Sequence, residues 1–212
     1  SVMALINISP YCSAGHSSFY TNEALGIKRL TNDCLLKSMK NCYQFENVNM
    51  YEHGVMVHEA YKSLIDLLES GMILEGLPES LIEVYQKNKD NLFDMPCMKF
   101  YQTYHDCGKP YCRTVDEDGK QHFPDHAKVS YEKFKKVFPE EEVEQMLILH
   151  DMDFHTLKVE ELIELSNSDY GFSLYLTAWA EIVANCTMFG GMDSVSFKIK
   201  KKKLIKCLKL FK

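Results

Sequence analysis

Apolar residues recur at intervals of three and four along most of the chain, which is the spacing of one face of an α-helix. This spacing predicts a helix from Thr21 onward and a longer one from about Asn49 to Glu69. Pro78 and Pro96 stand where a first-turn proline opens a helix, because proline lacks the N–H that such a position leaves unpaired. Four more helices are expected over Pro124–Val137, Pro139–Met152, Val159–Asn167 and Tyr170–Cys186.

Few stretches break this helical pattern. The helix from Pro96 is expected to stop at Gly108 and Pro110, and TVDEDGKQ contains an Asp-Gly pair that favours a tight loop or short hairpin. Val195, Phe197 and Ile199 alternate with polar residues, which predicts one short strand. The fold class is therefore all-α. We divide the chain into an N-terminal loop and helix (1–45), a central helical domain (46–190) and a C-terminal tail (191–212).

Composition fits a folded chain whose charge is unevenly distributed. Of the 212 residues, 46% are apolar and 25% charged, which is ordinary for a globular protein. The formal charge is −6, but the segment from Phe197 to Lys212 holds eight of the 24 basic residues and no acid. The rest carries 16 basic and 30 acidic residues, a net charge of −14. Phosphate chemistry on such a body would need bound cations to reverse the local field.

The basic tail and the cysteines bear on partners and location. In the tail, Leu204, Leu208 and Phe211 recur at helix spacing, so it either packs its apolar side on the core or binds nucleic acid or another acidic surface. The eight cysteines form no CxxC pair, which favours a reducing compartment. No run of eighteen apolar residues exists, and the opening SVMALINIS lacks a basic region, so we expect a cytoplasmic protein without a membrane span.

Histidines and one aspartate supply the candidate chemistry. His53 shares the inward face of its expected helix, and His150 follows the apolar positions of its own helix at the same phase. His105 and Asp106 are adjacent at a helix end, and His126 lies near a helix start. A single histidine on an apolar face is more often a hydrogen-bonded core residue. Several such groups together are costly to bury without a shared partner, and a divalent cation is the natural one.

Two segments resemble a known family. YHDCGKP resembles the HDxGKP signature of the HD superfamily, and HFPDHAKVS is similar to the F-P-x-H-x-x-x-S segment that follows it there. The pairing is most similar to the HD domains attached to bacterial tRNA nucleotidyltransferases and poly(A)-polymerase-like enzymes. The resemblance covers roughly 49–186 and implies an HD-domain-like helical bundle followed by a short basic tail.

Carried over by position, the resemblance implies a metal site. His53 would be the first ligand, and His105 and Asp106 the central ones, with Asp106 able to bridge two metals. His126 and His150 would match the additional histidines of members that bind two metals. Asp153 and His155 are candidates to orient His150. The implied cofactor is one or two divalent ions of Mn, Mg, Ni, Zn or Fe.

The last ligand departs from the family pattern. The family usually closes the site with an aspartate in a late helix, whereas LYLTAWAEIVANC has Glu181 at that place. Glutamate can coordinate, but its longer arm shifts the metal or leaves a single-metal site. Asp169 is the rival candidate.

The resemblance implies hydrolysis of a phosphoester in a nucleotide or at a nucleic-acid end, by a phosphomonoesterase or a cyclic phosphodiesterase that uses metal-activated water. Asp106 would act as base or bridging ligand, Lys109 would act in catalysis and in binding the phosphate, and Arg113 would bind substrate. Two alternatives stay open. One is an HD-type diiron oxygenase, and the other is a nucleic-acid-binding protein with a vestigial HD site.

Overall fold

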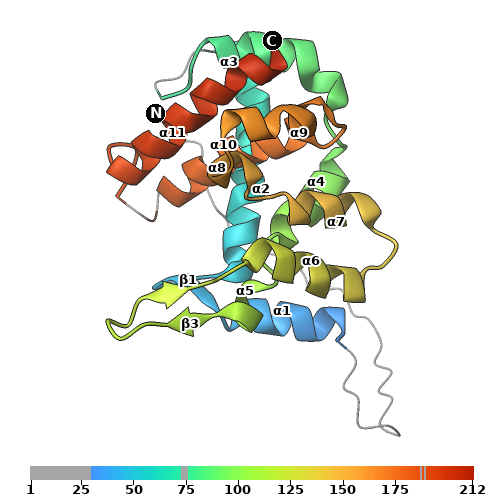
Figure 1. Ribbon diagram of the computed structural model, residues 1–212, viewed down its shortest axis with the longest axis vertical. Helices are drawn as coiled ribbons and strands as arrows, with labels where there is room; N and C mark the ends of the chain where they lie inside the picture. The colour runs from blue at the N-terminus through green and yellow to red at the C-terminus, as the bar shows by residue number, and fades with distance from the viewer. Residues whose placement is uncertain (1–29, 73–75, 187, 189) are drawn as a thin grey trace, which may run out of the picture.

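The computed structural model describes residues 30–72, 76–186, 188 and 190–212. The beginning of the helix expected from Thr21 and most of the predicted N-terminal segment lie outside these residues. Helices dominate the described part, and its two sheets each consist of two short strands, so the prediction of an all-α fold is confirmed (Figure 1). The α-helices are α1 (Asn32–Lys40), α2 (Met50–Ser70), α3 (Ser80–Asn88), α4 (Met95–Tyr104), α5 (Lys109–Cys112), α6 (His126–Val137), α7 (Glu142–Leu149), α8 (Asp153–Thr156), α9 (Ile163–Asn167), α10 (Gly171–Cys186) and α11 (Val195–Cys207).

Helix α2 is the spine of the molecule and runs along its long axis (Figure 1). It begins in a capping box, in which the Asn49 side chain accepts from the Glu52 N–H while the Glu52 carboxylate accepts from the Asn49 N–H. It ends at Gly71, whose φ of 69° is left-handed. Between these ends α2 contacts α4 and α10, and α1 and α3 pack near its two ends. The sequence prediction of this helix is correct to within one residue at each end.

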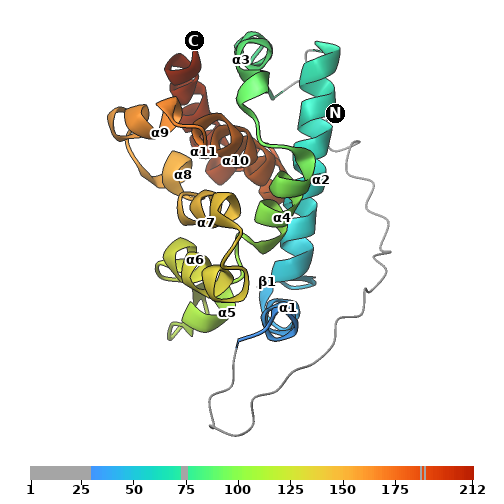
Figure 2. The ribbon, with the colours of Figure 1, turned by 90° about the vertical axis from the view of Figure 1, so that its right-hand side faces the viewer.

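Helix α10 forms the centre of the core. Its side chains are buried on almost every side, including Trp179 and Tyr175 at 0% exposure. A helix that is apolar all round can be stable only when other elements cover it. Here α2 packs on one side, while α8, α9 and α11 pack against it from others (Figure 2).

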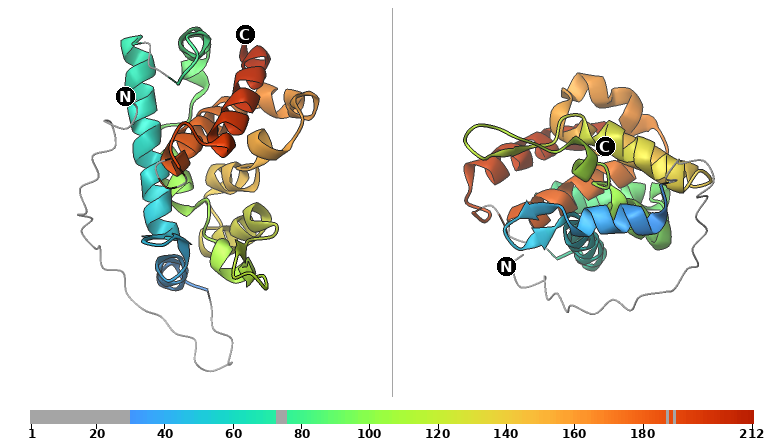
Figure 3. Two further views of the ribbon diagram at one scale, coloured as in Figure 1. Left: turned by 90° about the vertical axis from the view of Figure 1, so that its left-hand side faces the viewer. Right: turned by 90° about the horizontal axis from the view of Figure 1, so that it is seen from below.

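The C-terminal tail is helical and docked, and the predicted strand over Val195–Ile199 is wrong. Ser194 caps α11 by accepting from the Phe197 N–H, and the helix crosses the outside of α10 (Figure 3). The 3₁₀ helix η5 (Leu208–Phe211) continues it. The apolar residues that decide the structure are seven, four and three apart, so burying them on one face requires a helix rather than a strand. They are Phe197, Leu204, Leu208 and Phe211, all buried.

Two hairpins lie at the end of the molecule where α1 is found (Figure 3). Strands β1 (Tyr43–Phe45) and β2 (Val48–Asn49) pair antiparallel, with Tyr43 opposite Asn49. Strands β3 (Thr114–Val115) and β4 (Gln121–His122) also pair antiparallel and confirm the hairpin expected at the Asp-Gly pair.

Some helix limits differ from the expected ones. Helix α4 ends at Tyr104, and a separate short helix, α5, starts at Lys109 with Pro110 in its first turn, where the pattern predicted only a stop. Helix α3 starts two residues after Pro78. The helix expected over 139–152 is shorter, at Glu142–Leu149. Two further 3₁₀ helices, η3 (Lys89–Asn91) and η4 (Val159–Leu162), precede α4 and α9.

Both terminal elements of the described chain pack on the central helices, α1 on α2 and α11 on α10. The domain limits at residues 45 and 190 stay predictions. Within the residues described, no helix combines the length and apolar character needed to cross a membrane.

Candidate metal centre

Three predicted ligands meet in the interior, where α2 passes the end of α4. His53 comes from the first turns of α2, and His105 and Asp106 directly follow α4. Their exposed fractions are 1%, 2% and 1%. Oδ2 of Asp106 lies 3.7 Å from Nε2 of His53 and 3.3 Å from Nε2 of His105. These groups are close enough together to hold one metal ion.

A glycine lets α2 and α4 approach closely at this point. A Cβ on Gly54 would lie 2.3 Å from the carbonyl oxygen of Thr103, a contact that real Cβ atoms do not make. The backbones of the two helices therefore touch one residue after His53 and two residues before His105. This contact sets the separation of the two imidazoles, whose ring centroids are 5.4 Å apart.

The imidazole of His105 is oriented by its own helix. Its Nδ1 lies 2.7 Å from the carbonyl oxygen of Gln102, so Nδ1–H donates there and Nε2 faces the cluster. The side chain of Gln102 is itself held between helices, because its Oε1 lies 2.7 Å from Nδ1 of His58 and its Nε2 donates to Thr177 Oγ1 at 2.9 Å. A backbone carbonyl that accepts from the second nitrogen is one of the common ways in which proteins orient a metal-ligating histidine.

A second buried group shares His105. Nε2 of His105 lies 3.5 Å from Oε1 of Glu181 on α10, and Asp151 completes a group that could also hold a metal ion. Tyr101 OH donates to Oδ1 of Asp151, and Oε2 of Glu181 lies 3.0 Å from Nε2 of His155. The glutamate that closes the predicted site is therefore at the cluster, whereas Asp169 is exposed and belongs to neither group.

His150 is not brought to the cluster, and Asp151 takes the inward position in its place. Nδ1 of His150 lies 2.7 Å from Oδ2 of Asp153, in a half-exposed pair. The inward phase expected for His150 assumed a helix that continues to Met152. Because α7 ends at Leu149, the next residues form a turn, and the second one points into the core. His155, expected beside His150, contacts Glu181 instead.

His126 lies at the edge of the cluster. It begins α6, after Asp125 with a φ of 51°, which is uncommon outside glycine. Its Nδ1 lies 3.1 Å from the carbonyl oxygen of Phe123, and its Nε2 is 3.7 Å from Oδ1 of Asp106. With 18% of its side chain exposed, it is the most accessible of the histidines around Asp106.

The two predicted phosphate-binding cations lie in different surroundings. Lys109 is buried, with Nζ 2.7 Å from Oδ2 of Asp106 and 3.1 Å from Oε1 of Gln44 on β1. Arg113 is exposed, and its Nε donates to the side chain of Gln121 on β4. Lys109 is thus part of the cluster, while Arg113 stands outside it.

Burial and the neighbouring charges shift the proton affinities of the cluster. Burial lowers the pKa of His53 to about 4, so this imidazole is neutral. Burial would also lower the pKa of His105, but the carboxylates of Asp106 and Asp151 outweigh it and hold that pKa well above the usual range. The pKa of Asp106 lies well below its usual range, because His105 and Lys109 outweigh its burial.

The second group divides its charge unevenly. Burial and the nearby Glu181 carboxylate raise the pKa of Asp151 to about 7. Burial also opposes the charge of Glu181, but hydrogen bonds from His105 and His155 outweigh it and lower that pKa. The cluster therefore presents two carboxylates and a neutral imidazole to its centre. Such a field attracts either a proton on His105 or a metal cation.

Unpaired polar atoms test whether a metal fits here. Among the described residues, five buried atoms of these side chains have no hydrogen-bond partner, although leaving such a group unpaired costs about 1–3 kcal/mol. Imidazole nitrogens and carboxylate oxygens are the ligands that divalent transition metals use in proteins. The residues present therefore fit a divalent ion. The unpaired atoms are Nδ1 and Nε2 of His53, Nε2 of His105, Oδ1 of Asp106 and Oδ2 of Asp151.

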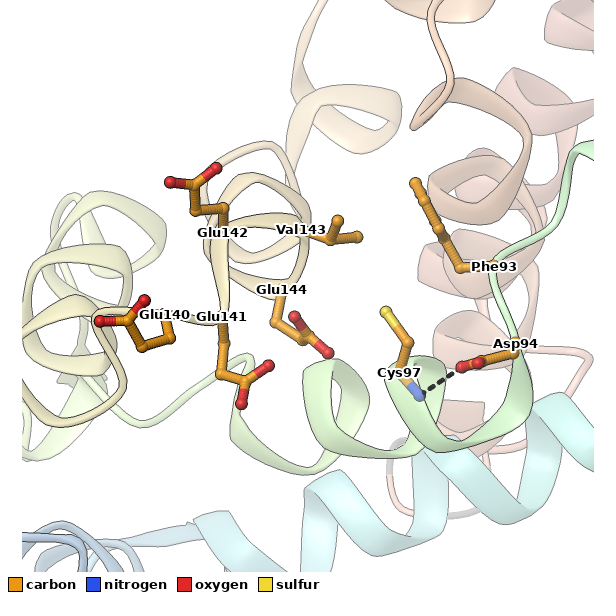
Figure 4. A pocket seen from close by; sticks show the side chains of 8 residues that line it. All are labelled: Phe93, Asp94, Cys97, Glu140, Glu141, Glu142, Val143 and Glu144. Atoms are coloured by element: carbon orange, nitrogen blue, oxygen red, sulfur yellow. Dashed lines mark hydrogen bonds between the residues drawn. The ribbon is translucent and has the colours of Figure 1, made fainter.

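An acidic hollow between α4 and α7 is a separate feature (Figure 4). It measures about 500 Å³, and Glu144 lies on its Cys97 side, whereas Glu140 and Glu142 point elsewhere. Burial and the Glu144 carboxylate raise the pKa of Cys97 to about 12, so its thiol stays protonated. Within the described chain, this hollow contains neither of the two groups that could hold a metal.

The chain was compared with protein-family models, curated proteins and solved structures. Neither a protein-family model, nor a curated protein, nor a solved structure matches the chain.

Proposed function

We propose that the chain is a metal-dependent phosphohydrolase of the HD type. Its reaction would be hydrolysis of a phosphoester bond in a nucleotide or at a nucleic-acid end, as a phosphomonoesterase or a cyclic phosphodiesterase. The observation that supports this most is the convergence of His53, His105 and Asp106, with unpaired ligand atoms, in the interior of the protein. A cytoplasmic location is part of the same proposal.

The ligand set divides between two positions. His53, His105 and Asp106 would hold one divalent ion, and His105, Asp151 and Glu181 offer a second position. A divalent ion at such a site lowers the pKa of bound water toward about 7 and offsets charge on a phosphoryl group. Because the Nδ1–H of His105 donates to the Gln102 carbonyl, only Nε2 has a free lone pair, so His105 would bind an ion at one of the two positions at a time.

The chain's own residues would orient and neutralise the reacting groups. Because the Gln102 carbonyl accepts from Nδ1–H of His105, the neutral tautomer of this imidazole has its free lone pair on Nε2, where a cation would bind. Lys109 balances the charge of Asp106 from the side of β1, and leaves Oδ1 of that carboxylate facing His126. Because His126 is the partly accessible member around Asp106, a phosphate is expected to enter on its side, toward the buried ammonium of Lys109.

The test combines metal content with a substrate screen. Protein purified in the presence of Mn²⁺, Ni²⁺ or Zn²⁺ is assayed by elemental analysis and against phosphomonoesters, cyclic phosphodiesters, dNTPs and short RNA. Asp106→Asn is the site variant. Asp153→Asn is the matched control, because that carboxylate pairs with His150 away from the cluster. We expect bound metal and hydrolysis in the parent chain and in the control, and neither in Asp106→Asn.

Three results would overturn the proposal. Protein that binds no metal under any of these conditions would remove its basis. Hydrolysis that survives in Asp106→Asn within tenfold would exclude the metal mechanism. Tightly bound iron with a near-ultraviolet absorption band and no hydrolysis would favour an oxygenase instead.

A further inference from the structure

A basic groove lies between η4 and α11. It measures about 740 Å³. Lys202 and Lys206, four residues apart on α11, are separated by about 6 Å along the helix axis and lie on the same side of it. A single acid, Glu160, is found among its lining residues. The basic lining residues are Lys158, Lys202, Lys203, Lys206 and Lys209.

Within the part of the chain that the structure describes, none of the five lysine ammonium groups of this groove forms an ion pair. The chain outside the basic tail nevertheless carries a net charge of −14. Lys198, outside the groove, reaches Asp193 at 4.0 Å, and Lys203 Nζ donates to the backbone carbonyl of Leu157. Like charges held together repel one another. A bound anion with several charges would relieve this repulsion.

The shape of the surface favours a nucleic-acid strand over a lipid membrane as the binding partner. An amphipathic helix that binds a membrane inserts its apolar face into the lipid. Here the apolar face of α11 is already used, since Phe197 and Leu204 are buried in the core. The lysines line a concave channel, of which Ile199 is the exposed apolar residue. A channel of this kind can follow a phosphate backbone, with ammonium groups contacting successive phosphates.

We propose that this groove binds the phosphate backbone of a single-stranded nucleic acid. In sequence, Lys158 of the groove follows three residues after His155, which contacts Glu181 of the cluster. Binding of the strand does not rest on the proposed phosphohydrolase function.

Binding is measured with the full chain and a fluorescein-labelled 12-nucleotide RNA, by anisotropy in EDTA over a series of salt concentrations. The groove variant carries Lys202→Gln, Lys206→Gln and Lys209→Gln, all at exposed positions. The matched control carries Lys87→Gln, Lys120→Gln and Lys136→Gln, which are also exposed and change the net charge equally. Vesicles containing phosphatidylserine form a second arm.

We expect the groove variant to raise the Kd of the RNA about tenfold or more, and the control to change it less than threefold. The slope of log Kd against log salt should fall by about 2, because each phosphate contact to a single strand contributes about 0.7. Equal effects of both variants, or no RNA binding by the parent chain, would overturn the proposal. So would vesicle binding that depends on the groove while RNA binding does not. Since EDTA removes the metal, failure here is separate from failure of the hydrolase proposal.

Discussion

The contact at Gly54 allows the clearest test of how the fold positions the site. Replacing it with alanine adds a Cβ 2.3 Å from the Thr103 carbonyl oxygen and 2.8 Å from its carbonyl carbon. Both atoms belong to the backbone, so no side chain can rotate away. To reach the shortest distance that Cβ atoms tolerate, 3.0 Å, α2 and α4 must separate by at least 0.7 Å.

Two opposing effects set the size of the change. Alanine is favoured over glycine inside a helix by about 1 kcal/mol. Overpacking against a rigid backbone costs about 1–3 kcal/mol or more, so we expect a net loss of about 1–2 kcal/mol. For a chain of this size that lowers Tm by about 2–8 °C. The same displacement separates His53 from His105, and a misplacement near 1 Å is enough to cost about 100-fold in a positioned site.

The assay measures two quantities on the same protein. Thermal unfolding in EDTA reports the packing, and calorimetric titration with Mn²⁺ reports the ligand geometry. Gly71→Ala is the control, because it strains a left-handed residue at the far end of α2, where no described atom lies within 4 Å of the new Cβ. Gly71→Ala should lower the free energy of unfolding by about 1 kcal/mol and leave the affinity for Mn²⁺ unchanged.

An unchanged Tm for Gly54→Ala would show that the helices are not in fixed contact there. A lowered Tm with metal affinity within threefold of the parent chain would show that the contact does not set the site.

Three further changes probe individual carboxylates. Asp106→Ala should reduce hydrolysis about a thousandfold or more while the far-ultraviolet circular dichroism stays the same; activity within tenfold would contradict its role. Glu181→Gln should weaken Mn²⁺ binding about 10- to 100-fold, whereas Asp169→Asn should not, and the reverse order would move the closing ligand. Burial raises the pKa of Asp151 from about 4 in the unfolded chain to about 7, so the metal-free fold holds a proton that the unfolded chain releases and loses stability as pH rises between these values. In EDTA, Asp151→Asn should therefore raise the free energy of unfolding at pH 8 by up to about 4 kcal/mol and change it little at pH 4; an equal gain at both values would refute this.

Local sequence signals were sufficient for those parts of the fold that are determined by the apolar face and the ends of a single helix. The apolar period and flanking capping residues of α2 were sufficient to place His53 on its buried side. The pair His105-Asp106 could be placed at a helix end because Gly108 and Pro110 follow. These signals act within a few residues, so no tertiary contact was needed to interpret them.

The errors have a common cause, which is that long-range packing decided the outcome. Val195, Phe197 and Ile199 alternate like a strand, yet only Phe197 is buried, because α10 supplies the surface on which the tail docks. The end of α7 decided between His150 and Asp151: the helix stops three residues before the expected Met152, and Asp151 rather than His150 faces inward. Periodicity alone cannot locate such an end to one residue.

The hairpin of β3 and β4 belongs to a segment whose two ends, Gly108 and Ser130, are in contact. The Gly108 N–H donates to Oγ of Ser130 at 2.9 Å, and the backbones there are so close that a Cβ on Gly108 would lie 2.2 Å from the Ser130 nitrogen. This contact therefore holds together the two ends of the segment between Gly108 and Ser130. At its tip, a Cβ added to Gly119 would meet no described atom within 4 Å. Extra residues inserted at that tip, such as an epitope or a fluorophore-binding peptide, should lengthen the hairpin without moving Gly108 or Ser130.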